Sequence, residues 1–526
     1  MPPAEQLIPH ECDVVIIGAG AGGLTAAALL ARAGLRTVTL EMDSQVGGYL
    51  AGFRRNGFTF SSSIEWLNQC APGGYVNNLF RYLGEDIPSF PPMQRIRRFK
   101  NAAGDYLLTT NPDELRDALI RDFPADASGI TRLFAEAKRL GARLAQLDGR
   151  TVSAEAMAPL ERAVHGLKML WWALPVIPFI RMPIEKGLRR YFSNTAGQRI
   201  FGSHDTMMSV VVSIAWAYAD NFQNCPVGGS QAIADWLHER IEHFGAKVHL
   251  RQRVARIELN RSKEACGVIL EDGRTIAARY VIAACDLENL YEQMLPSAAI
   301  PARLKEELRN ADLYHSNLSI FLGLDCSPAA FGLGEEAINL SRNDIRREEH
   351  FNGDPHTTAI VVMAPSIQDP TLAPPGKGTL TLHCPAFLDY QNNWRTGKGF
   401  ERGPAYRALK EEFADILIDR VAATLIPALR DHIEVKEICT PVTYWRYTGN
   451  ARGSFSGTKP TGKNIRAKVA HHRTPVKKLL IGGHCGEYGG GVPIAVKSGA
   501  NAALMVLQEL DPQAAKELKR VMNKRR

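Results

Sequence analysis

Residues 14–41 read VVIIGAGAGGLTAAALLARAGLRTVTLE, and this stretch decides the fold of the chain. The β-branched run 14–17 is typical of a buried strand, and the alanine-rich run after Gly23 is typical of a helix. The glycines between them predict a tight turn at Gly18, a bare backbone at Gly20 and close packing of helix on strand at Gly23. A strand, a glycine turn and a helix in this order predict a nucleotide site where the helix begins.

A second strand is predicted over residues 36–40, and Glu41 stands at its end. A carboxylate at this place can accept hydrogen bonds from both hydroxyls of an adenosine ribose, and it would repel a 2′-phosphate. A glycine turn with a purely structural role is the alternative. Nucleotide binding is favoured because the strand, glycines, helix, second strand and terminal acid all stand in register.

Composition limits the remaining possibilities. A length of 526 residues predicts two packed domains. The formal net charge of +8 is spread along the chain without interleaved aromatic residues, so we expect no nucleic-acid partner. Nine cysteines without a CxxC pair favour a reducing compartment and give no sign of a metal site. Without a secretion signal or an apolar run of about 18–20 residues, we expect a cytoplasmic protein, in solution or on the inner face of a membrane.

Three segments resemble one superfamily of flavoproteins. In EMDSQVGGYLAGF, Gly47 and Gly48 resemble the segment by which the glutathione-reductase type, amine oxidases and phytoene desaturases enclose a dinucleotide beyond its ribose. CPVGGSQAIADWLHERIEHFGAKVHLRQRVARIEL resembles the segment that offers backbone contacts to adenine, around Val254. KKLLIGGHCGEYGGGVPIAVKSGANAALMVL resembles the strand, glycine loop and helix that face the flavin pyrimidine.

The resemblance is strongest to the phytoene desaturase, carotenoid isomerase and retinol saturase group. It implies FAD as the cofactor and an α/β fold, a Rossmann-like FAD-binding domain of glutathione-reductase type with an inserted mixed α+β substrate domain. The expected cofactor-binding residues are Gly18, Gly20, Gly22, Gly23, Glu41, Gly47, Gly48, Val254, Gly483, Gly491 and Val492.

The expected domains are discontinuous. Residues 1–90, 225–295 and 471–526 are assigned to the FAD-binding domain, and residues 91–224 and 296–470 to the substrate-binding domain. The resemblance covers roughly the first 70 residues, the stretch from Cys225 to about Leu290 and about the last 50 residues. The middle of the chain matches only loosely.

The chain departs from its relatives at several places. Tyr49 stands where the family often has Arg or Lys, and Ser61 stands where relatives often have Asp. His484 follows Gly483 where an acid commonly holds a flavin hydroxyl, a role that Glu487 or the backbone could take. These differences bear on substrate and reaction direction more than on flavin binding.

The resemblance implies an FAD-dependent oxidoreductase that desaturates, saturates or isomerises C=C bonds of a long apolar isoprenoid or polyene. The sequence has no second nucleotide-binding unit and no redox cysteine pair, so the flavin would exchange electrons with oxygen, a quinone or the substrate itself. The catalytic candidates are Glu65, Tyr488, Glu487, His204 and Asp205, because a carboxylate or imidazole beside a polyene could stabilise a cation or return a proton. A structural role is the alternative for each of them.

Residues 166–192 contain an apolar stretch, Met169 to Ile180, that is too short to span a membrane and is flanked by basic residues. Trp171 and Trp172 suit a lipid headgroup boundary, so we expect either a membrane-contacting segment or a buried helix pair over the substrate cavity. Two other functions remain open. One is an amine-oxidase-type flavoenzyme acting on another apolar small molecule, and the other is a lipid-escort protein that keeps the fold without catalysis.

Overall fold

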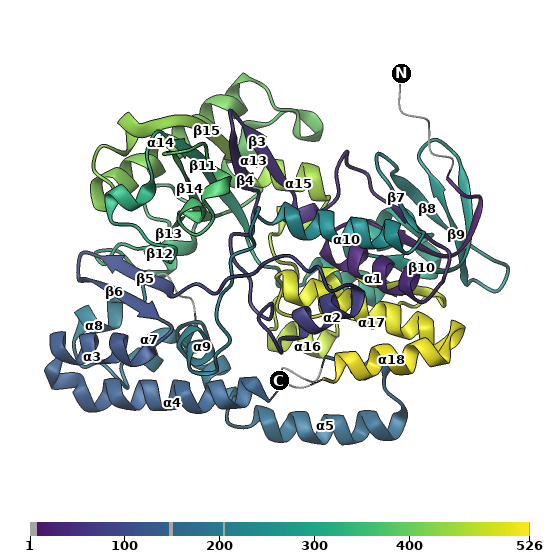
Figure 1. The fold of residues 1–526 in the computed structure, drawn as a ribbon, viewed down its shortest axis with the longest axis horizontal. Helices are drawn as coiled ribbons and strands as arrows, with labels where there is room; N and C mark the ends of the chain where they lie inside the picture. The colour runs from purple at the N-terminus through teal and green to yellow at the C-terminus, as the bar shows by residue number, and fades with distance from the viewer. Residues whose placement is uncertain (1–7, 147–150, 203–205, 525–526) are drawn as a thin grey trace.

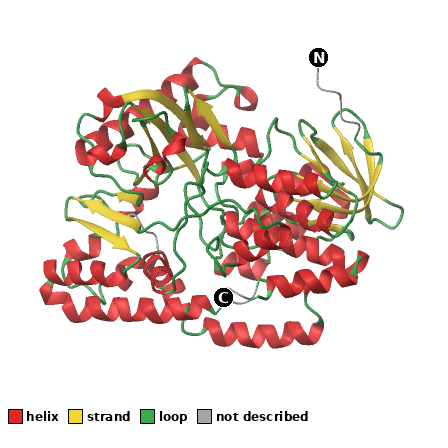
Figure 2. Ribbon diagram, in the orientation of Figure 1, coloured by secondary structure: helices red, strands yellow, loops and turns green. Residues whose placement is uncertain are grey.

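The computed structural model describes residues 8–146, 151–202 and 206–524. Two sheets lie at opposite sides of the molecule, with loops running between them and a group of helices below the second sheet (Figure 1). Figure 2 shows helices around the first sheet, along the lower edge of the molecule and beside the second sheet. Among the described residues, no helix is long and apolar enough to cross a membrane.

The first sheet combines parallel strands from three distant parts of the chain. Its order is β7 (Lys247–His249), β2 (Thr37–Leu40), β1 (Glu11–Ile17) and β10 (Thr275–Ala283), and β16 (Leu479–Ile481) pairs with β10. All these pairings are parallel. Strands β8 (Val254–Leu259) and β9 (Ala265–Leu270) continue from β10 as an antiparallel meander. The predicted Rossmann-like arrangement is confirmed.

Helices cover one face of this sheet. Helix α1 (Ala21–Arg32) packs against α17 (Val492–Leu510) and α10 (Gln231–His243), and α17 in turn contacts α18 (Pro512–Met522). Helix α2 (Tyr75–Leu83) packs against α18. Alternate β1 residues supply the two cores, since Val14 and Ile16 meet these helices and Val15 meets the meander. Because both faces are covered here, residues 14–17 of β1 are all buried or nearly so, and the sequence predicted this run as a buried strand.

The second sheet is mostly antiparallel. Its order is β15 (Ile433–Cys439), β11 (Ser316–Leu324), β14 (Gly378–Ala386), β13 (Ile360–Met363), β12 (Ala337–Leu340), β5 (Arg95–Asn101) and β6 (Gly104–Thr109). One face packs its leucines and isoleucines against α14 (Pro404–Thr424). The opposite face meets the hairpin of β3 (Gly52–Arg55) and β4 (Phe58–Ser61), which belongs to the N-terminal part of the chain.

Three of the remaining helices pack together beside β5 and β6, and the others are spread along the chain. Helices α3 (Pro112–Asp122), α4 (Ala127–Ala145) and α9 (Met207–Tyr218) form a core with β5 and β6. The other helices are α5 (Pro159–Ala173), α6 (Ile177–Arg181), α7 (Ile184–Leu188), α8 (Thr195–Arg199), α11 (Leu287–Asn289), α12 (Ala302–Arg309), α13 (Tyr390–Arg395, a left-handed turn), α15 (Pro441–Thr448) and α16 (Gly462–Ala467), and all of these except α5 are short.

The segment 166–192 divides into two parts. In the described chain, α5 has no buried residue, and Trp171 is 74% exposed. Residues from Met182 onward pack into the core with α4 and α9. Helix α5 is therefore not part of a buried helix pair. The later part of the segment, from Met182 onward, is buried in the core. The domain boundaries expected from the sequence stay a prediction.

Candidate active site

A cavity of about 400 Å³ opens where β1, β2 and β10 end and where α1 and α17 begin. Residues of six separate stretches line it, and the stretches fall within 17–22, 40–64, 252–271, 284–294, 447–456 and 483–495. The carboxyl ends of parallel strands are the usual place for ligands in such sheets. This cavity is therefore the candidate cofactor site.

The first glycine loop forms one wall of the cavity. Gly18 has φ +98°, which a residue with a side chain rarely adopts, so it permits the turn after β1. A Cβ on Gly23 would lie 2.0 Å from the Gly18 carbonyl oxygen, so this glycine brings helix and strand together. A Cβ on Gly20 would meet nothing closer than Gly47 O at 3.9 Å and would stand in the cavity.

The second glycine pair lies directly against the first loop. The Gly47 N–H donates to Ala19 O at 2.9 Å, and a Cβ on Gly48 would lie 3.3 Å from the Gly20 Cα. Gly22 also lines the cavity, and a Cβ there would lie 2.3 Å from Gly482 O. The glycines thus give both a smooth cavity wall and tight packing behind it.

Two helices begin at this cavity. Helix α1 has Gly20 as its N-cap and α17 has Gly491, and no described side chain caps either helix. Gly491 and Val492 both line the cavity. Uncapped helix N-termini present free N–H groups and a partial positive charge. Two such ends facing one space make it suited to an anionic ligand.

Glu41 lies at the end of β2, where the sequence placed it. Its side chain lines the cavity and accepts hydrogen bonds from the Ala19 N–H at 2.8 Å and the Asp43 N–H at 2.9 Å. Burial raises the pKa of this carboxyl, and the two backbone donors oppose the shift. A carboxylate has lone pairs beyond these two bonds, so it can still accept from ribose hydroxyls.

The other cofactor candidates reach the same cavity. Val254 begins β8 and Gly483 follows β16, and both line the cavity. His484 lines it too, in place of the acid expected from relatives, and burial lowers the pKa of its imidazole. A neutral imidazole therefore stands where relatives often carry a negative charge.

These residues fit a flavin dinucleotide. The bare Gly20 faces the N-terminus of α1, as a pyrophosphate requires, and Glu41 stands one strand away, as an adenosine ribose requires. The α17 N-terminus lies at the other glycine loop, where it favours negative charge on a flavin pyrimidine.

Glu65 is buried beside this cavity. Its neighbour Ile64 lines the cavity, while the Glu65 side chain points into the space under the second sheet, near Thr381. Burial raises the pKa of Glu65 to about 7, and the Thr381 hydroxyl opposes the shift. Its Oε1 atom has no hydrogen-bond partner among the described residues. Glu65 can therefore hold a proton near neutral pH.

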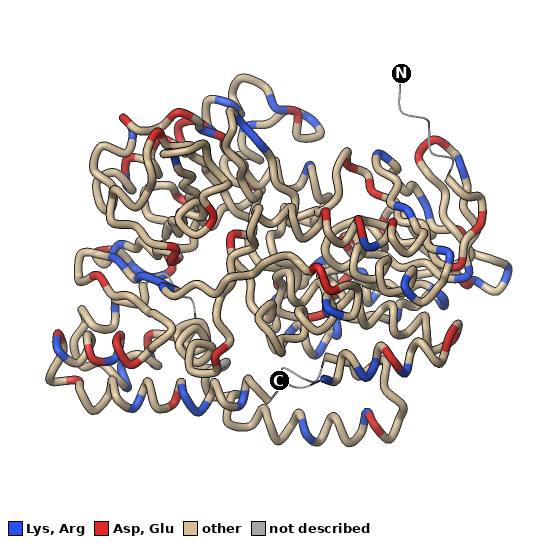
Figure 3. Tube along the Cα trace, in the orientation of Figure 1, with Lys and Arg blue, Asp and Glu red and all other residues tan. Residues whose placement is uncertain are grey.

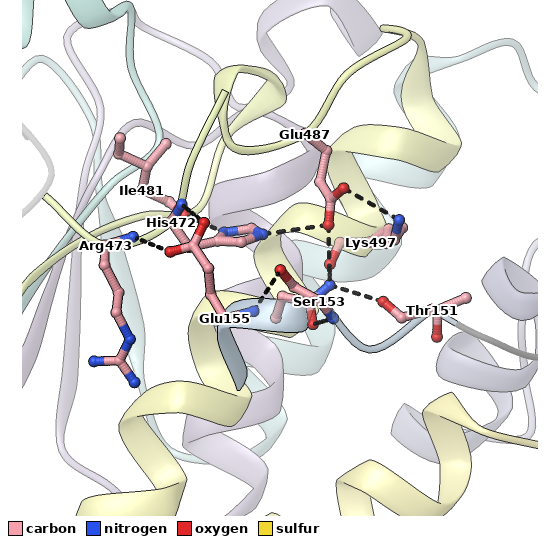
Figure 4. A network of polar contacts seen from close by, with 9 residues as sticks. Thr151, Ser153, Glu155, His472, Arg473, Ile481, Glu487 and Lys497 are labelled. Atoms are coloured by element: carbon pink, nitrogen blue, oxygen red, sulfur yellow. Dashed lines mark hydrogen bonds and ion pairs between the residues drawn. The ribbon is translucent and has the colours of Figure 1, made fainter. Parts of the chain in front are cut away.

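Glu487 is placed differently. It joins a polar network with His472 at 3.3 Å and Lys497 at 3.1 Å, which Figure 4 shows together with Ser153 and Thr151. Asn501 links the network by donating to Glu487 and to Thr151 O. The nearby cations hold the pKa of Glu487 to about 2 against the effect of burial. This carboxylate is permanently charged and already paired.

The remaining catalytic candidates do not come together at the cavity. The Tyr488 hydroxyl donates to Asn464 O at 2.8 Å, and burial raises its pKa. Tyr488 and Glu487 are not among the residues that line the cavity in the described chain. His204 and Asp205 lie outside the described residues.

The sequence missed an aromatic cluster beside the cavity. Tyr49 and Phe455 line the cavity, and both rings pack on Tyr444 of α15, with centroids 5.8 Å and 5.4 Å away. The Tyr49 hydroxyl donates to Ser454 O at 2.8 Å. Further cavity residues that the sequence missed are Met42, Gln252, Asn289, Gln293, Thr448, Asn450 and Ser456. Most lie in loops without a motif, so only the fold brings them here.

The family model described as flavin containing amine oxidoreductase matches residues 21–507. An all-trans-retinol 13,14-reductase of Danio rerio is 26% identical over 98% of this chain and 89% of its own length. Prolycopene isomerase 1, chloroplastic, of an Oncidium hybrid cultivar is 25% identical over 85% of this chain and 75% of its own.

A solved structure shows the same fold. Cyclohexylamine oxidase from Brevibacterium oxydans superposes with a TM-score of 0.59 at 15% identity, covering 95% of this chain and 99% of that one. The family match covers most of the chain and includes both the α1 and the α17 sides of the cavity. This chain belongs to the flavin containing amine oxidoreductase family, and it is an FAD-dependent oxidoreductase.

Proposed function

We propose that this enzyme acts on the C=C bonds of a long apolar isoprenoid or polyene, by saturation, desaturation or isomerisation. The observation that carries this is the uncharged aromatic wall of Tyr49, Tyr444 and Phe455 beside the cofactor cavity. Such a wall offers contact area to a conjugated chain without requiring a charge on it. Relatives named as a retinol reductase and a prolycopene isomerase match most of the chain and support the same class.

In this proposal the FAD residues act as the sequence suggested. Gly18, Gly20 and Gly23 would bring the α1 N-terminus to the pyrophosphate, Glu41 would hold the ribose, and Gly47 and Gly48 would enclose the dinucleotide. The remaining predicted cofactor residues would line the parts of the cavity that hold the adenine and the flavin ring. They are Gly22, Val254, Gly483, Gly491 and Val492.

The substitution Gly20→Val tests the pyrophosphate assignment. The backbone at Gly20 is extended (φ −76°, ψ 179°), and the space around it is open, so valine fits the empty protein. Its methyl groups would occupy phosphate space, so we expect a folded but colourless protein. Gly166→Val, in open space on α5, is the control and should keep its flavin. Full flavin content in Gly20→Val would contradict the assignment.

Bound FAD would supply the redox step, the exchange of a hydride with a substrate carbon. The protein's own part is to bind and orient the chain, exclude water and manage one proton. Glu65 is the residue best placed to hold that proton, because it is buried, unpaired at Oε1 and protonated near neutral pH. In the saturating direction its proton would go to the second carbon of the double bond.

The test is an anaerobic reaction of the photoreduced enzyme with polyenes of retinoid and carotenoid length. Reoxidation of the flavin with a product two hydrogens heavier shows saturation. An unchanged mass with a shifted absorption spectrum shows isomerisation, and a product two hydrogens lighter from the oxidised enzyme shows desaturation. No reaction with any polyene would overturn the proposal. Adding oxygen or a quinone after reduction identifies the electron acceptor.

Amine oxidation is the second candidate, because an aromatic cluster next to a flavin also suits a cationic or amine substrate. Its support is the family name and the likeness to amine oxidases in fold. Relatives named as a retinol reductase and a prolycopene isomerase match most of the chain, so the polyene proposal is preferred. A panel of amines that reoxidises no flavin while a polyene does would separate the two.

We also propose that α5 contacts a membrane surface. Its exposed apolar side chains recur at intervals of three and four residues, which places them along one side of the helix. They are Leu160, Val164, Leu167, Trp171 and the C-cap residue Leu174, and Leu170 is exposed beside them. Charged residues on α5 are few (Figure 3). Lys519 of α18 lies 2.6 Å from Glu161 of α5, and this ion pair holds α18 against α5. The net positive charge of α18 favours anionic lipid.

Sedimentation with vesicles tests this contact. We expect the protein to pellet with vesicles of phosphatidylcholine mixed with phosphatidylglycerol and to stay in the supernatant after Leu167→Ser with Trp171→Ser. Ile465→Ser changes another exposed apolar residue, on α16, and should leave pelleting intact. Unchanged pelleting of the double variant would remove α5 from the contact.

A further inference from the structure

A row of polar side chains lies on the inner face of the second sheet. Ser319 of β11 and His383 of β14 stand opposite each other in the antiparallel register. Their neighbours Leu318 and Leu382 point the other way, into the core under α14. Because strand side chains alternate, Ser319 and His383 face the N-terminal hairpin and the cofactor domain instead.

These residues form one hydrogen-bonded chain. The His383 Nδ1 atom lies 2.7 Å from the Ser319 hydroxyl, which lies 2.6 Å from the Tyr444 hydroxyl. Tyr444 also reaches Ser62 O at 2.9 Å. The Tyr444 hydroxyl donates to Ser319 Oγ, so the Ser319 hydroxyl proton is free to donate to His383 Nδ1. The His383 proton then stands on Nε2, which is an unpaired donor.

Two buried side-chain atoms of this region have no hydrogen-bond partner among the described residues. They are His383 Nε2 and Glu65 Oε1. His383 is 9% exposed and Glu65 5%. An unpaired buried polar atom costs about 1–3 kcal/mol, so natural proteins rarely keep two in one place without a use. Thr381 connects them, since it contacts Glu65 and lies two residues before His383 on the same face of β14.

Both groups border the aromatic wall of the cofactor cavity. Phe455 lines the cavity, and its ring lies 6.5 Å from the His383 ring, centroid to centroid. Ile64, which precedes Glu65, lines the cavity from the other side. The unpaired atoms therefore lie between the cavity wall and the second sheet.

His383 is uncharged near neutral pH, and Glu65 is divided there between its protonated and its charged form. Burial lowers the pKa of His383 to about 4 and raises that of Glu65 to about 7. A neutral imidazole does not attract a carboxylate, and a protonated carboxyl does not attract an ammonium group. A pure hydrocarbon would leave both atoms unpaired. The group that satisfies them is a neutral oxygen, as in an alcohol or a ketone.

We propose that His383 is a specificity-determining residue whose Nε2 atom hydrogen-bonds a neutral oxygen at one end of the substrate. Ser319 and Tyr444 position the imidazole and fix which nitrogen carries its proton. This inference rests on the proposed action on polyenes and adds that a polyene with a hydroxyl or keto end is preferred over the hydrocarbon of the same length.

The test compares kcat/KM for a polyene alcohol and for a hydrocarbon polyene of matched length. We expect the wild-type enzyme to prefer the alcohol by roughly 10- to 100-fold. His383→Asn keeps an amide near the Nδ1 position but removes the Nε2 contact, so the preference should fall toward unity with turnover of the hydrocarbon retained. His383→Gln places an amide near the Nε2 position and should restore part of the preference.

Ser319→Ala is the variant that tests positioning, and it avoids a change in the imidazole itself. It should lower the alcohol preference less than His383→Asn while flavin content and the flavin absorption spectrum stay unchanged. If wild-type enzyme turns over polyenes without preferring the alcohol, or if His383→Asn keeps the preference, this inference fails and the proposed function stands. If no polyene reacts at all, the proposed function fails first.

Discussion

Glu65 and Glu487 are both largely buried glutamates that follow glycine-containing segments, yet the fold gives them opposite surroundings. Glu487 is paired with His472 and Lys497, and its pKa falls to about 2. Glu65 has no cation beside it, and its pKa rises to about 7. The first carboxylate is charged and satisfied, whereas the second keeps a proton and has a free oxygen atom.

The difference teaches where catalytic groups are to be sought in this molecule. A paired carboxylate is already used by the fold, here to join α17 to the 151–155 segment (Figure 4). An unpaired carboxyl buried beside a cavity lowers the stability of the fold, and a substrate that hydrogen-bonds to it removes this free-energy cost. We therefore assign Glu487 to structure and Glu65 to chemistry, and four experiments separate the two roles.

The largest expected effect is on turnover in Glu65→Gln. Loss of a general acid lowers kcat by about 10²- to 10⁴-fold, while flavin content should not change because Glu65 does not line the cofactor cavity. The rate of single-turnover reoxidation of the photoreduced enzyme by a polyene measures the loss of turnover. Glu487→Gln is the matched control and should react normally per bound flavin. Equal losses of kcat in both variants would contradict the assignment of Glu65 to chemistry and of Glu487 to structure.

The next effect is on stability in Glu487→Gln. Removing one partner from a buried ion pair leaves His472 and Lys497 uncompensated, which costs about 3–5 kcal/mol. Urea unfolding should show a clearly lower midpoint for this variant. Glu487→Gln combined with Lys497→Met should recover part of the loss, since the unpaired charge is then removed. A loss below about 0.5 kcal/mol, the size of an ordinary surface change, would contradict the pairing.

The third effect is a difference in pH dependence. Glu65 stabilises the fold fully below its unfolded pKa near 4.5, and this contribution is lost as pH rises through about 7. Glu65→Gln should therefore raise Tm relative to the wild type more at pH 8 than at pH 5. Glu487 has the opposite sign, since its contribution is present above the unfolded pKa and is lost as pH falls toward 2. Parallel pH profiles for both variants would be inconsistent with these environments.

The smallest effect is expected from Tyr488→Phe. This change removes the hydroxyl that donates to Asn464 O, a contact worth about 1 kcal/mol, and leaves the ring in place. Tm should fall slightly, with kcat and flavin content as in the wild type. A large fall in kcat would return Tyr488 to the catalytic candidates and weaken the contrast between the two regions.

The cofactor half of the molecule was predictable because its signals are local. The strand at 14–17, the glycine turn and the helix that begins at Ala21 are encoded within a few residues of one another. The helix after Ser230, the strand at Val254 and the strand and helix after Lys478 also lie where the sequence placed them. Glycines decide these positions through φ angles and close contacts that no other residue allows.

The catalytic region was not predictable in the same way. Ser319, His383 and Tyr444 come from two strands and a helix far apart in the chain, and none belongs to a motif. Likewise, the glycines around Glu487 and Tyr488 made these two residues catalytic candidates in the sequence. In the structure Glu487 pairs with Lys497 of α17 and with His472 of the loop before β16. Only the folded arrangement of α17 and this loop brings these partners to it. Side-chain partners across such distances depend on tertiary packing.

Strand β16 is made of residues 479–481 and pairs with β10, while helix α17 covers α1 at the start of the chain. During synthesis, α1 therefore leaves the ribosome more than 400 residues before its cover exists. Part of the apolar surface of α1 stays uncovered until residues 479–510 have been made, so a chain that stops before them lacks one wall of the nucleotide cradle. Cofactor capture that uses both walls would therefore report that the 479–510 segment has joined the first sheet.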